Sequence, residues 1–235
     1  PGDGFVTRVL AGSEPGTVVL VGGGDPTLTA LPDGETGTYP APARLAELAE
    51  EVREAATVPV ERVVVDLTRW SGPELAEGWA PGDVRGGFVT PIVPLMLDGG
   101  RDDPALQDGP RTTEPALEAG RALAELLDAD PDETAAGTAP SDAARLGAVT
   151  SAPFSVLVEH MMRSSDNVLA EALAREVALV RGGEPTFARS EPSWQPPATA
   201  TAPPLEPTAR DYRDLFRRSV RVAVLVFCGW LIAVL

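Results

Sequence analysis

Small polar side chains cluster at Ser164-Ser165-Asp166-Asn167, between two apolar segments. A serine hydroxyl both accepts and donates a proton, and an asparagine amide offers donors and acceptors without charge. Such side chains on a turn held between two helices are well placed for a functional site. The same residue types also favour caps and turns, so a plain helix–helix turn with Asp166 or Ser165 as N-cap explains the pattern equally well.

Few other residues offer nucleophilic or metal chemistry. The chain has one cysteine, Cys228, and one histidine, His160, which excludes an internal disulfide and any multi-cysteine metal site. Cys228 lies in an apolar tail and His160 in an amphipathic segment, so we expect His160 to be a helix-surface or partly buried residue rather than half of a catalytic pair. All 19 basic residues are arginine. No step that needs a lysine amine can therefore be performed by this chain.

Size and charge narrow the function classes. The chain has 235 residues, enough for one large domain or two small ones. Its formal net charge is -16, from 35 acidic residues against 19 basic ones. A protein that neutralises phosphates needs clustered positive charge, so nucleic acid is not an expected partner.

Two helices should frame the polar cluster. Ser151-Ala152-Pro153 is typical of a helix start, with the serine as cap and the proline in the first turn. Apolar residues then recur at helical spacing before the cluster and again after it: Phe154, Leu157, Val158, Met161, Val168, Leu169, Ala172 and Leu173.

The N-terminal part alternates between strand and helix patterns. Thr17–Val21 is a β-branched apolar run that predicts a buried strand, followed by a tight glycine turn rather than a phosphate loop. The amphipathic pattern of Pro42–Ala56 predicts a helix, with Pro42 suited to its first turn. Arg62–Leu67 predicts another strand. The alternation indicates a small α/β layer on one core.

The middle of the chain is less regular. The segment Trp70–Val93 is rich in Gly, Pro and Trp and predicts loops, leading into one or two strands from Gly87 onward to Met96. Its tryptophans, Trp70 and Trp79, are suited either to stacking on a sugar or, more commonly, to anchoring a long loop on the core.

A helix and a linker complete this part. Thr113-Glu114-Pro115 predicts a helix start with Thr113 as the cap and Pro115 in the first turn. The acidic stretch from Asp128 to Asp142 predicts a polar linker.

Four stretches resemble a known family. They are Val18–Thr27 (VVLVGGGDPT), Ser71–Trp79 (SGPELAEGW), Leu97–Arg101 (LDGGR) and, most strongly, Met161–Ala174 (MMRSSDNVLAEALA). Collinear over roughly residues 1–189, they resemble the actinobacterial low-molecular-mass penicillin-binding proteins, which are serine-type D-alanyl-D-alanine carboxypeptidases and endopeptidases.

The resemblance implies a mechanism with Ser-x-x-Lys, Ser-x-Asn and Lys-Thr-Gly motifs and no metal or organic cofactor. Only the second motif is present, as Ser165-Asp166-Asn167. By analogy, Ser165 relays the proton to the leaving amine. Asn167 donates to the substrate's amide carbonyl and steadies the nucleophile's lysine, and Asp166 points away and braces the loop.

The resemblance also implies a fold and its divisions. The expected class is α+β, a partial penicillin-binding (transpeptidase/β-lactamase-like) domain with a large inserted α/β domain. Residues 1–148 are then mostly the inserted domain, and 149–189 the helical part that carries Ser-Asp-Asn. The first motif is expected just before Pro1 and the third beyond residue 190, so the chain alone is expected to be inactive.

The C-terminal region does not continue the resemblance. Residues 190–210 are rich in Pro, Ala and Thr and predict an extended linker. Residues 211–235 are basic and then apolar, and 222–235 is shorter than the ~20 residues of a membrane span. The arginines before it would place the preceding domain inside the cell. A truncated membrane anchor, a fusion and a frameshifted end all remain open.

Two functions follow as alternatives. The first is a fragment of a D-alanyl-D-alanine carboxypeptidase that acts outside the cytoplasm on peptidoglycan stem peptides ending in D-Ala-D-Ala, and that reacts with β-lactams in its intact form. The second is a non-catalytic pseudoenzyme, tethered to the membrane through residues 222–235, that binds the cell wall.

Overall fold

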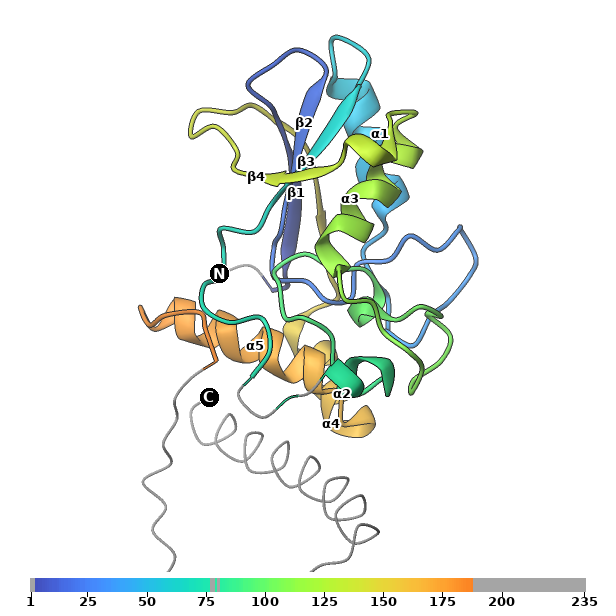
Figure 1. Ribbon diagram of the computed structural model, residues 1–235, viewed down its shortest axis with the longest axis vertical. Coiled ribbons are helices and arrows are strands. Elements are labelled where there is room, and N and C mark those ends of the chain that lie inside the picture. Colours follow the sequence, from blue (N-terminus) through green and yellow to red (C-terminus); the bar gives the residue numbers. More distant parts are fainter. Residues whose placement is uncertain (1–2, 77–78, 80, 188–235) are drawn as a thin grey trace, which may run out of the picture. The chain divides into compact units, whose positions relative to one another are not determined.

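A five-stranded sheet forms the centre of the N-terminal part (Figure 1). The computed structural model describes residues 3–76, 79 and 81–187. The strands lie in the order β4-β3-β2-β1-β5, with the bounds β1 Val6–Ala11, β2 Thr17–Val21, β3 Arg62–Asp66, β4 Ala135–Gly137 and β5 Arg145–Thr150. The predicted strands at Thr17 and Arg62 are thus confirmed.

The sheet contains both antiparallel and parallel strand pairs. Strands β1 and β2 form an antiparallel hairpin, and β5 pairs with β1 antiparallel on the other side. Strands β2, β3 and β4 are parallel, and each step between them passes through a helix on the sheet. Parallel neighbours require such crossovers.

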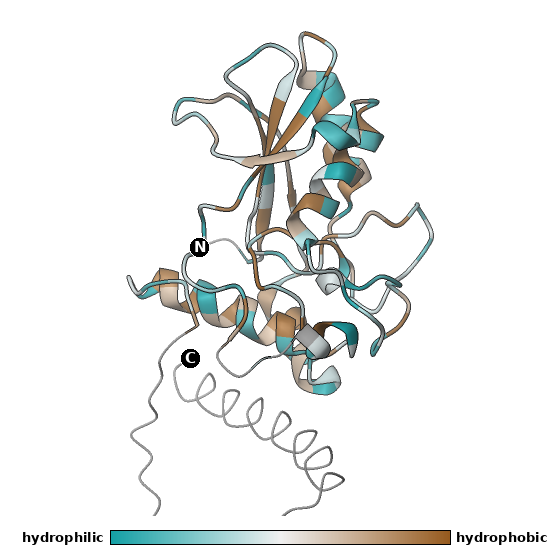
Figure 2. Cartoon of the chain, viewed as in Figure 1, coloured by the Kyte–Doolittle hydropathy of each residue, from teal (hydrophilic) through white to brown (hydrophobic). Residues whose placement is uncertain are grey.

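Helices α1 (Leu45–Ala55) and α3 (Pro115–Leu126) cover one face of the sheet (Figure 1). Gly147 in β5 lets α1 approach, because a Cβ there would lie 3.1 Å from the Leu48 side chain. The central strands are markedly apolar, whereas both helices alternate between polar and apolar residues (Figure 2). The fully buried core includes Val9, Leu20, Val63, Val65, Leu45, Leu48, Val52, Ala119 and Leu123.

Two helices follow the sheet. After β5 the chain forms α4 (Phe154–Ser164) and α5 (Asn167–Val180), which pack on each other. Shorter elements are α2 (Pro81–Arg85) and the 3-10 turns η1 (Asp98–Gly100) and η2 (Pro131–Glu133).

Strand β1 begins where β5 ends. Val6 pairs with Thr150, and two hydrogen bonds of 3.0 Å join Phe5 to Ser151: Ser151 N donates to Phe5 O, and Phe5 N donates to the side-chain Oγ of Ser151. The Phe5 and Phe154 rings meet edge to face, with centroids 4.9 Å apart. The two ends of the chain segment between Phe5 and Ser151 therefore lie next to each other.

Three predicted helix starts are wrong in detail. Helix α1 begins at Leu45 with Arg44 as N-cap, so Pro42 precedes it. Helix α3 has Pro115 at its first position as predicted, but its N-cap is Glu114. The side chain of Ser151 does not cap α4, because its oxygen is engaged by the Phe5 N–H and it donates to the Ala152 carbonyl.

Other segments also differ from prediction. The apolar stretch 87–96 forms no strand and makes only an isolated bridge between Leu95 and Asp25. The predicted linker 128–142 contains η2 and β4, because the free edge of β3 accepts a short parallel strand. Strands β1 and β5 were not predicted.

The contacts divide the chain into Pro1–Phe187 and Ala188–Leu235, and the structure describes residues only of the first unit. The predictions for residues 190–210 and 211–235 thus lie outside the described residues, as does Cys228. Of the helices that the structure does describe, none is long and apolar enough to span a membrane.

Candidate functional site

The Ser-x-Asn triplet lies at the junction of α4 and α5. Ser165 ends α4 in the left-handed conformation (φ 55°, ψ 44°), and its N–H donates to the Met161 carbonyl. Asp166 is the N-cap of α5, and its Oδ1 accepts the Leu169 N–H over 2.9 Å. Asn167 is already the first residue of α5. The predicted loop is thus only two residues long, and the predicted capping role of Asp166 is confirmed.

The carboxylate of Asp166 is the anchor of this junction. Its Oδ2 accepts from Arg101 Nη2 and from the Tyr39 hydroxyl, each over 2.9 Å. The side chains of Asp166 and Arg101 are both fully buried. The Arg101 guanidinium also stacks on the Tyr39 ring, 4.8 Å from its centroid. Three segments distant in sequence therefore converge on one carboxylate.

Charge keeps this carboxylate ionised. Burial by itself would raise the pKa of Asp166, but the guanidiniums of Arg111 and Arg101 and the Leu169 hydrogen bond hold that pKa below its usual value. Burial and the charge of Asp166 raise the pKa of Tyr39, so its hydroxyl remains a donor. The cluster is therefore a charge-assisted hydrogen-bond network.

The two outer residues of the triplet are more accessible than the middle one. Ser165 and Asn167 are half-buried, whereas Asp166 is 2% exposed. Asn167 Nδ2 donates to the Phe88 carbonyl over 3.2 Å, and the Ser165 hydroxyl has no hydrogen-bond partner among the described residues. The arrangement leaves a hydroxyl available beside an oriented amide.

A second arginine holds the loops that reach the triplet. Arg111 is buried and donates from Nε to the Gly87 carbonyl over 2.9 Å and from Nη1 to the Gly99 carbonyl. Gly87 precedes the residue whose carbonyl receives the Asn167 amide. Arg111 thus links the Phe88 loop to the turn that carries Arg101.

His160 lies next to this network. It is half-buried, as predicted, and its ring centroid is 5.5 Å from that of Tyr39. Its Nε2 is buried without a hydrogen-bond partner among the described residues. Burial lowers the pKa of His160, and Arg101 lowers it further against the opposing effect of Asp166. Burial and the nearby guanidinium thus disfavour the imidazolium form.

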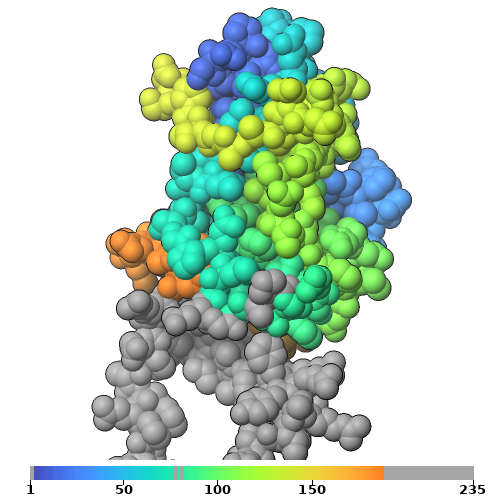
Figure 3. Space-filling view, in the orientation of Figure 1, coloured from blue at the N-terminus to red at the C-terminus, as the bar shows by residue number. Residues whose placement is uncertain are grey.

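The tryptophan loop is anchored on α5. Trp70 is buried, and its Nε1 donates to Glu176 over 3.1 Å. Arg69 pairs with Glu176, and the buried Arg175 donates to the Pro73 carbonyl and lies 5.2 Å from the Trp70 ring centroid. Figure 3 shows the two segments side by side on the surface. Of the two predicted roles, anchoring is the one that the structure shows for Trp70.

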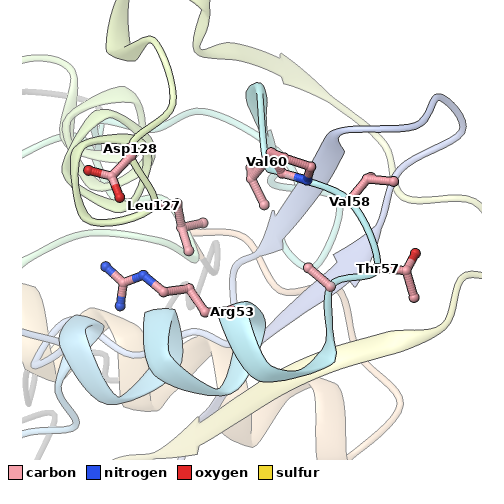
Figure 4. Close-up of a pocket in the computed structure, with 8 residues that line it drawn as sticks. Arg53, Thr57, Val58, Val60, Leu127 and Asp128 are labelled. Atoms are coloured by element: carbon pink, nitrogen blue, oxygen red, sulfur yellow. The ribbon is translucent and has the colours of Figure 1, made fainter.

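A separate pocket of about 460 Å³ lies at the C-terminal ends of α1 and α3 (Figure 4). It is lined by Arg53, Ala56, Thr57, Val58, Pro59, Val60, Leu127 and Asp128. None of these residues comes from α4 or α5, so the pocket is not part of the triplet's surroundings. In the described part of the chain no group of three His, Cys, Asp or Glu residues is placed to hold a metal ion.

Sequence reasoning identified the triplet but not its supports. Arg101 was noticed only as the end of the LDGGR stretch, and Tyr39 was not singled out. Their contacts with Asp166 span 65 and 127 residues of sequence. No local pattern marks such a contact. A hint was available in LDGGR, where an arginine follows two glycines directly after the apolar stretch that ends at Leu97.

Comparison with known proteins places these features in a family. Residues 3–112 and 105–194 match the D-Ala-D-Ala carboxypeptidase 3 (S13) family. The chain is 44% identical over 175 residues to a carboxypeptidase of Mycobacterium tuberculosis and 43% identical over 175 residues to carboxypeptidase DacB of Mycolicibacterium smegmatis. These matches cover 74% of this chain and 38% of each relative.

The fold has a solved counterpart. The crystal structure of penicillin binding protein 4 (dacB) from Haemophilus influenzae superposes with a TM-score of 0.57 at 17% identity, over 78% of this chain and 54% of that one. The predicted α+β class, a partial penicillin-binding fold, is thereby confirmed. Because the family match spans most of its length, this chain belongs to the D-Ala-D-Ala carboxypeptidase 3 (S13) family.

Proposed function

We propose that this chain is part of a serine-type carboxypeptidase that cleaves the terminal D-Ala-D-Ala amide of peptidoglycan stem peptides through an acyl-enzyme. The family to which the chain belongs supports this reaction, and the chain spans 38% of the length of the carboxypeptidases it matches. Ser165 and Asn167 are the residues that it contributes to the chemistry, and Asn167 also binds substrate.

The observation that carries the proposal is the triplet's construction. A fully buried, ionised Asp166 fixes the backbone between two residues that stay accessible. A preorganised hydroxyl and amide are what acyl transfer to an amide substrate requires, because groups held in place need no reorganisation in the transition state. A plain helix–helix turn requires only the cap to Leu169 and not the buried ion pair.

Ser165 passes a proton and does not attack the substrate. Attack by a serine needs an adjacent base, and the chain contains no lysine. The only histidine, His160, packs its ring beside Tyr39, and among the described residues its Nε2 makes no hydrogen bond to Ser165. The nucleophilic serine and its lysine partners are therefore supplied by residues other than 1–235. We infer that a polypeptide of these residues alone does not react with penicillin.

The proposed substrate sets the place of action. The stem peptides of assembled peptidoglycan lie outside the cytoplasm, so we expect the complete enzyme to work in the cell envelope. β-Lactams, which acylate serine enzymes of this type, are the expected inhibitors. Membrane contact through residues 222–235 remains a hypothesis on residues outside the described range.

Labelling with a fluorescent penicillin tests the proposal. We expect the complete enzyme to be labelled covalently and to release D-alanine from a pentapeptide. Ser165→Ala and Asn167→Ala should each slow acylation by about 10²-fold or more, as for other positioned catalytic groups. Ser164→Ala is the matched control, since that neighbouring hydroxyl only donates to the His160 carbonyl, and it should acylate at the normal rate.

Two results would contradict the proposal. Covalent attachment of penicillin to Ser165 would make it the nucleophile. A complete protein that binds pentapeptide but never releases D-alanine would instead favour the non-catalytic cell-wall-binding alternative.

A further inference from the structure

The triplet is held by two residues that lie far from it in the sequence. Tyr39 lies in the loop before α1, and Arg101 follows η1, yet both contact the carboxylate that separates Ser165 from Asn167. Residues up to about 148 correspond to the segment that we expect to be an insertion into the penicillin-binding domain.

We propose that Arg101 and Tyr39 are positioning residues for the Ser165–Asn167 turn, and that through them the inserted segment sets the catalytic geometry. The proposal rests on the assignment of Ser165 and Asn167 as functional residues. It adds residues that touch no substrate and act only through Asp166.

Both oxygens of Asp166 are committed, and to different elements. Oδ1 accepts from the Leu169 N–H inside α5, and Oδ2 accepts from Arg101 and Tyr39 outside it. The carboxylate therefore cannot rotate without breaking one set. Because Ser165 occupies a left-handed conformation that an L-residue adopts only when its surroundings require it, fixing the next residue also fixes Ser165.

The supports are rigid in turn. Arg101 Nη1 donates to the Asp98 carbonyl over 2.9 Å, and the Asp98 side chain accepts from Thr29 over 3.0 Å. Gly99 has a φ of 66°, and a Cβ there would lie 2.4 Å from the Tyr39 hydroxyl oxygen. The LDGGR turn is therefore shaped to bring the guanidinium and the phenol together.

A purely structural ion pair predicts a different outcome from a positioning one. Loss of a structural pair lowers stability and leaves the rate of the remaining folded enzyme unchanged. Loss of a positioning pair slows the folded enzyme itself, and the effect disappears when Asp166 is already altered. Double-mutant cycles separate these cases.

The test uses the complete enzyme with Tyr39→Phe, Asp166→Asn and the double variant. Tyr39→Phe removes one hydroxyl and keeps the ring under Arg101, so the fold should persist. We expect acylation by benzylpenicillin to slow about tenfold, which is the effect of one lost hydrogen bond to a charged group. For release of D-alanine from the pentapeptide, kcat should fall while KM stays within about twofold. In the Asp166→Asn background, Tyr39→Phe should change the rate less than about twofold.

Thr68→Val is the matched control, since it also removes a hydroxyl that donates to a buried carboxylate, that of Asp66 in β3. It should leave the acylation rate unchanged. An unchanged rate in Tyr39→Phe, or equal slowing in both backgrounds, would overturn the proposal.

Hydrogen exchange provides a readout that does not depend on activity. In Tyr39→Phe and Arg101→Met, the amides of residues 164–169 should exchange at least about tenfold faster, while those of β1, β2 and β3 keep their protection. Unchanged exchange at 164–169 would refute the positioning role even if the enzyme is active. If exchange responds but wild type never reacts with penicillin, the proposed function fails and the positioning of the turn stands.

Discussion

The buried pair between Arg101 and Asp166 predicts an unusual ranking of stabilities. We compare Arg101→Met, Asp166→Asn and the double variant with wild type at pH 7. Both charged side chains are fully buried and 2.9 Å apart. We expect the double variant to be more stable than either single variant, because it leaves no charge buried without its partner.

The magnitudes follow from what remains in each variant. Arg101→Met leaves the Asp166 carboxylate buried with Tyr39 and Leu169 as donors, so we expect a loss of about 3 kcal/mol. Asp166→Asn strands the guanidinium against the Asp98 carbonyl and should cost about the same. In the double variant the asparagine still caps α5 and its amide meets the Tyr39 hydroxyl, so the loss falls to about 1 to 2 kcal/mol.

Urea unfolding followed by far-ultraviolet circular dichroism measures these values. The Asp166 pKa is depressed in the fold. Its contribution is therefore complete above its unfolded pKa and lost as pH falls through the lower folded value, so pH 7 reports all of it. Arg62→Met, which breaks an exposed pair with Glu133, is the control and should change stability by less than about 1 kcal/mol. A double variant that loses the sum of the singles, about 6 kcal/mol, would refute the reasoning.

Three further outcomes can be checked by the same unfolding measurements. Burial raises the pKa of Asp25 to about 6, so this group should add up to about 3 kcal/mol to the free energy of unfolding as pH falls from 7 to 4. Asp25→Asn should flatten that rise. An unchanged slope of unfolding free energy against pH in this variant would contradict the prediction. Burial likewise raises the pKa of Glu171 to about 7. Glu171→Gln should therefore reduce the dependence on pH between 7 and 5, and a dependence as steep as that of wild type speaks against this. Gly99→Ala should lower the free energy of unfolding by about 3 kcal/mol or more, because its Cβ meets Tyr39. Gly34→Ala also has a positive φ but open space around its Cβ, so it should lower that free energy by about 1 kcal/mol. Equal losses in the two variants would exclude the steric explanation.

Periodicity predicted the elements whose burial is continuous. Strand β2 contains the run VVLV and β3 the run VVV, and the stripes of α4 and α5 repeat at helical spacing. Strand β1 was missed because VTRVLA mixes polar and half-buried positions. Strand β5 was missed because Gly147 interrupts it for the approach of α1.

The site was predictable only in its local part. The sequence offers Asp166 or Ser165 as the cap of a helix, since cap and helix are adjacent in the chain, and the structure shows Asp166 in that role. The sequence does not indicate that the same carboxylate meets Arg101 and Tyr39, because that contact exists only once the sheet segment has folded against α4 and α5. A short strand such as β4, whose three residues are all exposed, carries no apolar signal at all.

The pairing of β1 with β5 has an evolutionary consequence. Because Val6 lies opposite Thr150 and Phe5 is hydrogen-bonded to Ser151, everything between them is joined covalently to the rest of the chain at a single double-stranded stem. Recombination can exchange such a segment for another with equally close ends without displacing the flanking domain. A replacement that keeps the stem would fold, but it would inherit Asp166 without Arg101 and Tyr39. Descendants of such an exchange would need a new partner for that carboxylate, which makes the buried acid a marker of how long the two parts have evolved together.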